Sequence, residues 1–246
     1  MISFTHVRSS AMVPQIGLIK SKNHSLPSLC VDSLEIFTYL KICKMEPEIN
    51  EASWAGPYVI YEDGSKSTDL RDIIKYIAKT AEREISLEER AIMSHIDSIL
   101  KPYLVDFLYD RHWDTVSRDL NFGLFPLSYI RNKLFRSNYR KKYPSRIISE
   151  ICSIIHQMSD YLGDRSYFSE CGKPNIIDAK VFAITALIIA LGKDSRDSVV
   201  DMIMNRENLM RHYKLMTPFV VKGLILVIEN KYPTQLIRIS ITRTFS

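Results

Sequence analysis

The stretch that decides the fold is 174-PNIIDAKVFAITALIIAL-191. Asn175 and Asp178 have the three-residue spacing of a capping box, in which side chains satisfy backbone N–H groups at the start of a helix. Apolar residues then occupy every face of the helix, and this pattern is typical of a segment buried on all sides. We therefore expect a central helix, with Asn175 and Asp178 as structural caps and not as an active-site pair.

Helical periodicity extends outward from this stretch in both directions. Ser86 and Glu89 form a second capping-box pattern, which predicts a long helix toward Tyr109. Further helices are expected over 127–142, 145–162 and 197–216. The sequence thus predicts an all-helical domain over residues 86–233, followed by an extension at 234–246 in which 236–246 alternates like a strand.

The first third of the chain has a different pattern. Residues 15–20 read as a strand, 28–43 as a helix, the region of Ile49 as a minimal strand, and 58–61 with 66–68 as a hairpin. Asp69 is placed to cap a helix that runs to about Lys79. Strands and helices in this order predict a small α/β domain over residues 15–80, preceded by an extension at 1–14.

Composition narrows the classes of function. The 246 residues include 46% hydrophobic and 25% charged residues, as in ordinary globular proteins. The chain has no glycine-rich phosphate-binding motif. The 4 cysteines and 6 histidines form no metal-binding spacing and no disulfide framework, so we expect no metal and a reducing compartment. No apolar run reaches the ~20 residues that a membrane-spanning helix needs.

A small α/β domain followed by helices around a buried, Asp-capped helix resembles the glutathione S-transferase architecture, with a thioredoxin-like N-terminal domain and an all-α C-terminal domain. Within that superfamily the sequence resembles the metaxins over about residues 15–215. The matching motifs, in chain order, are Leu26-Pro27-Ser28, Asp32-Ser33-Leu34, Phe125-Pro126-Leu127, Tyr161-Leu162-Gly163 and Asp178-Ala179. Residues 108–111 and Trp113 also resemble a sister group, the failed-axon-connections-like transferases.

The resemblance raises the question of a thiol site. Cys30 lies at a predicted helix start, where a thiol pKa can be lowered. Glutathione-binding relatives place a serine after the acidic residue that precedes the last helix of the α/β domain, whereas here Leu70 follows Asp69. Leucine offers no hydroxyl, so we expect no cofactor and no catalytic residue. If the chain is an enzyme, the candidate residues are Cys30, Ser33, Pro57 and Asp69, Pro57 standing where the superfamily has a cis-proline.

A basic segment lies in the helical half. No acidic residue occurs between Asp119 and Glu150. We expect this basic segment to face an anionic membrane surface or a partner protein, since each basic residue near an anionic leaflet contributes about 1 kcal/mol. A solvated helix face is the plainer interpretation, and nucleic acid is the least favoured partner. The residues concerned are Arg131, Lys133, Arg136, Arg140, Lys141 and Lys142.

The resemblance to metaxins implies a non-catalytic subunit of the mitochondrial sorting and assembly machinery. Such a subunit is peripheral on the cytosolic face of the outer membrane. Its expected partners are a β-barrel assembly core protein and a second metaxin-like subunit. The alternative function is a glutathione-dependent transferase or reductase of the failed-axon-connections-like group.

Overall fold

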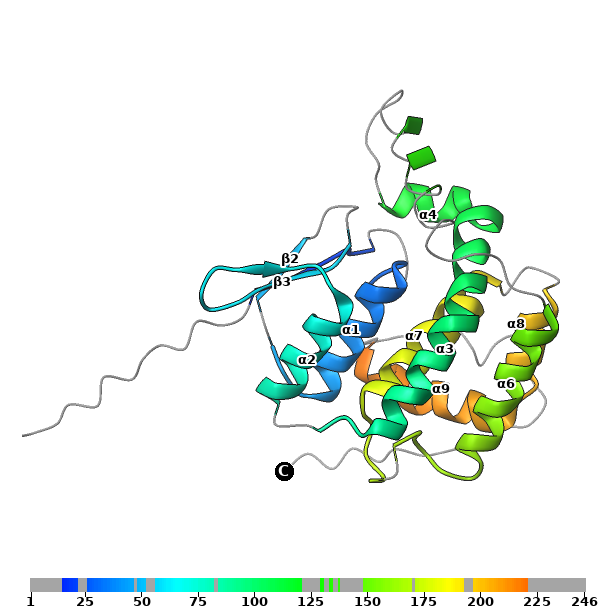
Figure 1. The fold of residues 1–246 in the computed structure, drawn as a ribbon. Coiled ribbons are helices and arrows are strands. Elements are labelled where there is room, and N and C mark those ends of the chain that lie inside the picture. The colour runs from blue at the N-terminus through cyan, green and yellow to red at the C-terminus, as the bar shows by residue number, and fades with distance from the viewer. Residues whose placement is uncertain are drawn as a thin grey trace, which may run out of the picture.

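A computed structural model of the chain shows a small α/β half beside a larger helical half (Figure 1). The structure describes residues 15–21, 26–46, 48–51, 56–81, 84–120, 129–130, 133–134, 137, 148–169, 171–192 and 197–220. The predicted extensions at 1–14 and 234–246, and the predicted strand at 236–246, lie outside these residues.

The α/β half contains a four-stranded sheet in the order β2-β1-β3-β4. Strand β1 pairs parallel with β2 and antiparallel with β3, and β3 pairs antiparallel with β4. Helices α1 and α2 lie on the same side of the sheet (Figure 1). This arrangement confirms the predicted thioredoxin-like domain. The elements are β1 (Gln15–Leu18), α1 (Val31–Ile42), β2 (Glu48–Glu51), β3 (Tyr58–Ile60), β4 (Lys66–Ser67) and α2 (Leu70–Thr80).

The helical half follows the predicted pattern. Residues 145–162 were expected as one helix, which is described from Ile148, and 197–216 divides into two helices at Asn205. Most of the predicted helix 127–142 lies outside the described residues. The elements are α3 (Leu87–Asp106), η1 (Phe107–Arg111), α4 (Trp113–Leu120), α6 (Ile148–Leu162), α7 (Ile176–Gly192), α8 (Ser198–Met204) and α9 (Glu207–Val220).

Helix α7 forms the centre of the molecule, as its sequence predicts. Every residue from Ile176 to Gly192 except Ala190 is buried. Neighbours on several sides, namely α1, α3, α8 and α9, pack against it. One continuous cluster of buried apolar side chains extends from Ile16 in the sheet to Val220 in α9. The two halves therefore share a single core.

The C-terminal end of α3 widens into the π-helical turn η1. The backbone N–H of His112 donates to the carbonyl of Phe107 at 3.1 Å, a five-residue span. Such a turn accommodates one residue more than an α-helical turn and redirects the side chains that follow it. Among the residues that the structure describes, no helix combines the length and apolar character required to cross a membrane.

Candidate functional site

Cys30 is the N-cap residue of α1, but its thiol is enclosed. The residue is 2% exposed and packs with Ile19 and the half-buried Tyr58. Burial, reinforced by the negative charge of Asp32, raises the pKa of the Cys30 thiol from 9.0 to about 11. The lowering of a thiol pKa that a helix N-terminus can cause does not prevail here, because desolvation of the thiolate outweighs it. Cys30 is therefore protonated at neutral pH.

The ring of Tyr58 forms the cover over this thiol. Tyr58 is paired with Gly17 across β1 and β3, and a methyl group at Gly17 would lie only 2.1 Å from the Tyr58 ring. The ammonium of Lys66 lies 3.7 Å from the ring centroid, which is a cation–π contact. Pro57, buried, immediately precedes Tyr58. The glycine thus makes room for an aromatic ring that packs against the buried pair of Cys30 and Ile19.

Ser33 and Asp69 both have structural partners. The Ser33 hydroxyl is buried and accepts a hydrogen bond from the Ile19 N–H at 3.1 Å, which ties the end of β1 to α1. Asp69 caps α2 by accepting from the Arg71 N–H at 2.8 Å, as predicted for this helix start. Leu70 is the first residue of α2. The structure therefore brings Cys30, Ser33 and Tyr58 around Ile19, while Asp69 serves the neighbouring helix.

Asp178 accepts three hydrogen bonds at the start of α7. They come from the backbone N–H groups of Phe168 at 2.7 Å and Asn175 at 2.9 Å, and from His212 Nε2 at 2.9 Å. The Asn175 side chain differs from its predicted capping role. Its amide donates to Glu89 at 3.0 Å, and its Oδ1 accepts no hydrogen bond from the described residues.

The partners of this cap were missed by sequence reasoning. Glu89 belongs to α3 and His212 to α9, so both are distant from α7 along the chain. Glu89 was interpreted only as half of its own capping box, and the structure shows that it also holds Asn175. The site joins three helices and has the character of a structural anchor.

A cluster of five charges lies between the two halves. Lys180 of α7 is within 3.1 Å of Glu35 and 2.8 Å of Asp97, and Lys101 of α3 is 2.6 Å from Asp32 of α1. The side chains of Lys180, Glu35 and Lys101 are nearly inaccessible. Burial raises the pKa of Glu35, while the charges of Lys180 and Lys101 oppose this shift. The lone lysine inside an apolar helix was the sequence signal for this cluster, because a buried ammonium requires carboxylate partners.

The basic segment is described at only one of its six residues. Lys133 is helical and exposed, and Arg131, Arg136, Arg140, Lys141 and Lys142 lie outside the described residues. Next to Lys133, the apolar residues Tyr129, Ile130 and Leu134 are each at least half exposed. Contact of this segment with a membrane or a partner stays a prediction.

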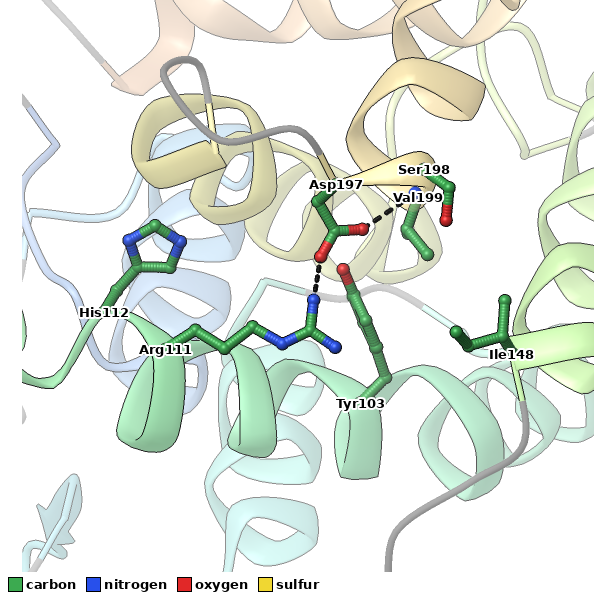
Figure 2. Close-up of a pocket in the computed structure, with 7 residues that line it drawn as sticks. All are labelled: Tyr103, Arg111, His112, Ile148, Asp197, Ser198 and Val199. Atoms are coloured by element: carbon green, nitrogen blue, oxygen red, sulfur yellow. Dashed lines mark hydrogen bonds and ion pairs between the residues drawn. The ribbon is translucent and has the colours of Figure 1, made fainter.

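A cavity of about 310 Å³ opens within the helical half, between η1 and the start of α8 (Figure 2). Arg111 forms an ion pair with Asp197, and the Tyr103 hydroxyl lies beside them. Sequence reasoning assigned no site to this pair, since 86 positions separate Arg111 from Asp197. The lining residues are Tyr103, Arg111, His112, Ile148, Asp197, Ser198 and Val199. In the described ranges, no group of three or more His, Cys, Asp and Glu residues is arranged to hold a metal ion.

Comparisons with known proteins agree with the fold. Residues 152–216 match the family model described as the glutathione S-transferase C-terminal domain. A glutathione S-transferase of Ceriporiopsis subvermispora, solved in complex with glutathione, has a TM-score of 0.61 and 13% identity, covering 86% of this chain and 99% of that one. No curated protein matches the sequence at a significant level.

Two glutathione transferases of Phanerochaete chrysosporium are similarly related in structure. One has a TM-score of 0.61 and 11% identity over 87% of this chain and 100% of its own. The other has a TM-score of 0.58 and 12% identity over 84% of this chain and 98% of its own. With a matching C-terminal segment and this agreement over both halves, the chain has the glutathione S-transferase-like fold.

Proposed function

We propose that this glutathione S-transferase-like protein acts by binding a partner and not by chemistry at Cys30. The observation that carries the proposal is the enclosed thiol. Cys30 is buried behind Tyr58 and its pKa is raised to about 11, so the nucleophilic thiolate is rare at neutral pH. Ser33, the other hydroxyl or thiol candidate on α1, already accepts the Ile19 N–H.

The finer form of this proposal is a metaxin-like subunit of the mitochondrial outer-membrane sorting and assembly machinery. It is supported by the ordered motifs that the chain shares with metaxins in both halves. The proposed partners are a β-barrel assembly core protein and a second metaxin-like subunit. The basic segment supplies a surface for an anionic membrane on the cytosolic face.

The test of this role is recovery of partners from membranes. A tagged form of the chain, expressed in cells and extracted with mild detergent from the outer mitochondrial membrane, is expected to co-purify with a β-barrel protein. Changing Arg140, Lys141 and Lys142 together to Glu should release the chain into the cytosolic fraction. A matched control changes Arg71, Lys75 and Lys79, three exposed cations on α2, to Glu. Equal fractionation of both triple variants would reject the role of the basic segment.

The second candidate is a glutathione-dependent transferase. The comparisons favour it over the metaxin role, because the matched family model and the solved structures named above are all of glutathione transferases. The test is calorimetric titration of the chain with glutathione, using wild type, Cys30→Ala and Ser33→Ala. Micromolar binding that either variant abolishes would establish this candidate and reject binding without chemistry. Absence of a saturable heat would reject it.

A further inference from the structure

None of the residues that line the cavity belongs to the cluster of Cys30, Ile19 and Tyr58. On α3, Asp97 and Lys101 face α1 and α7 through the buried charge cluster. Tyr103 follows Lys101 by two residues, which turns its side chain about 200° around the helix. It faces Asp197 at the start of α8 instead. The cavity therefore lies on the side of α3 that is turned away from the α/β half.

The Tyr103 hydroxyl is a buried polar group that points into this cavity (Figure 2). Tyr103 is 4% exposed, and no hydrogen bond of ordinary geometry from the described residues reaches its hydroxyl. A buried hydroxyl without a well-formed hydrogen bond costs free energy, so a ligand that pairs with it gains affinity. Burial, the charge of Asp197 and the interaction of the hydroxyl with the Asp197 carboxylate raise the pKa of Tyr103, so the hydroxyl stays protonated and is a donor that a ligand shares with Asp197.

Arg111 supplies positive charge at the opening of the cavity. Its side chain is half exposed, and one terminal nitrogen contacts the nearly inaccessible carboxylate of Asp197. The guanidinium carbon lies 5.8 Å from the centroid of the Tyr103 ring. A guanidinium has five N–H donors, so a second acceptor fits alongside Asp197.

The other polar residues add no free negative charge. Asp197 also accepts the Val199 N–H at 2.9 Å as the cap of α8, so its oxygens are engaged by the protein. The centroid of the His112 ring lies 4.4 Å from that of the Phe107 ring, with the two rings tilted by 53°. Burial together with the nearby Arg111 lowers the pKa of His112. A neutral imidazole offers one donor without a competing charge.

We propose that this cavity binds a small organic monoanion, a carboxylate on a compact apolar body. The carboxylate pairs with the solvent-facing edge of Arg111 and accepts a hydrogen bond from the Tyr103 hydroxyl. The apolar body rests against Ile148 and Val199, which line the same cavity. A volume of about 310 Å³ is at the lower end for ligand pockets, which restricts the body to about one ring.

A cationic ligand fits the same cavity poorly. The one carboxylate among the residues that line the cavity is that of Asp197, which is 6% exposed and paired with Arg111. A dianion is also disfavoured, because Asp197 already offsets the charge of Arg111. A ligand with a single carboxylate leaves one net negative charge, which lies at the half-exposed side chain of Arg111, where solvent screens it.

The proposal is tested with three probes that share one ring: benzoate, benzamide and benzamidine, with charges of −1, 0 and +1. Binding to the full chain is measured by ligand-detected NMR titration at pH 7.5. We expect saturable binding of benzoate, with benzamide at least about tenfold weaker, which corresponds to about 1.4 kcal/mol. Equal affinity for benzoate and benzamide, preference for benzamidine, or no saturable binding of any probe up to about 10 mM would overturn the proposal.

Variants connect the binding to named residues. Arg111→Gln should weaken benzoate at least about tenfold, and Tyr103→Phe about threefold to tenfold. Arg165→Gln is the matched control, since Arg165 also lies over a tyrosine ring in the helical half but is not among the residues that line the cavity. If Arg111→Gln misfolds because Asp197 loses its partner, the double variant Arg111→Gln with Asp197→Asn replaces it. Equal loss with Arg165→Gln would reject the site.

Discussion

Cys30 shows how local sequence and environment act in opposite directions on one residue. Its place at a helix start was visible in the sequence. Its enclosure by Ile19 and Tyr58 depends on neighbouring strands, and the sequence pattern located these strands without showing which of their side chains pack together. Gly17 was the one available signal, because a glycine in a strand often marks close approach of another group. The direction of the Cys30 pKa shift required knowledge of that packing.

Selective labelling checks the enclosure of Cys30. At pH 8 a thiol with a pKa of about 11 is ionised in about one molecule in a thousand, and the cover blocks reagent as well. Iodoacetamide should therefore label the exposed Cys171 well before Cys30, which reacts only when the chain unfolds. Peptide mass spectrometry over time gives both rates. Labelling of Cys30 as fast as Cys171 would contradict the enclosure.

The same thiol gives a pH dependence of stability. Its pKa is raised from 9.0 in the unfolded chain to about 11 in the fold, so the folded state holds the proton more tightly. The contribution of Cys30 is present below pH 9 and is lost as the pH rises toward 11. Urea titrations at pH 8 and 10.5 give the free energies of unfolding of wild type and Cys30→Ala. Relative to the variant, wild type should be less stable at pH 10.5 than at pH 8. A constant difference would refute the assigned shift.

At the scale of secondary-structure elements, the helix starts were the most predictable features. The caps of α2 and α3 appear where Asp69 and the Ser86–Glu89 pair indicate them, because these bonds are local in sequence. The partners that join α7 to other helices were not predictable, since Glu89 and His212 reach it only through tertiary packing.

A comparison of two variants measures the difference between a cap that is local in sequence and one that also joins separate helices. Asp178→Ala removes three hydrogen bonds in a buried position, and we expect a loss of about 3–5 kcal/mol in the free energy of unfolding. Asp69→Ala removes one bond at an exposed helix start and should cost about 1 kcal/mol. Urea denaturation of both variants provides the values. Similar losses would mean that Asp178 acts only as a local cap.

The charge cluster between α1, α3 and α7 makes a second prediction for the elements. Lys180→Met leaves Glu35 buried without its nearest cation and should cost about 3–5 kcal/mol, whereas Lys173→Met, at an exposed lysine, should have little effect. Adding Glu35→Gln to Lys180→Met should restore part of the loss, because the uncompensated charge is removed. Purely additive effects of the two changes would show that the pair is not coupled.

For the whole molecule, the order and approximate length of most elements followed from periodicity and turn residues, and with them the architecture, whereas helix α4 was not predicted. The residue boundaries 15–80 and 86–233 stay a prediction. The single apolar core that both halves share was harder to predict, because a sequence pattern shows that one face of an element is apolar without showing which other element packs on it. The cluster that runs from Ile16 to Val220 supplies that information.

A shared core predicts that both halves unfold together. The chain has 2 tryptophans, Trp54 in the sequence between β2 and β3 and Trp113 in α4, so single-tryptophan variants place one fluorescent residue in each half of the sequence. With Trp54→Phe or Trp113→Phe, fluorescence and circular dichroism should give one coincident urea transition. Two separated midpoints would show that the halves are independent folding units.

The π-helical turn η1 makes the geometry near Arg111 sensitive to chain length. Deletion of one residue between Phe107 and Arg111 would let the segment relax into regular α-helix, and the side chains at its end, Arg111 among them, would rotate by about 100° around the helix axis. The Arg111 guanidinium would then no longer contact Asp197, although all the residues that line the cavity were retained. Relatives that differ by a single-codon deletion at this point are thus expected to keep the architecture and lose the recognition chemistry, so that insertion length, and not residue identity, becomes the diagnostic trait.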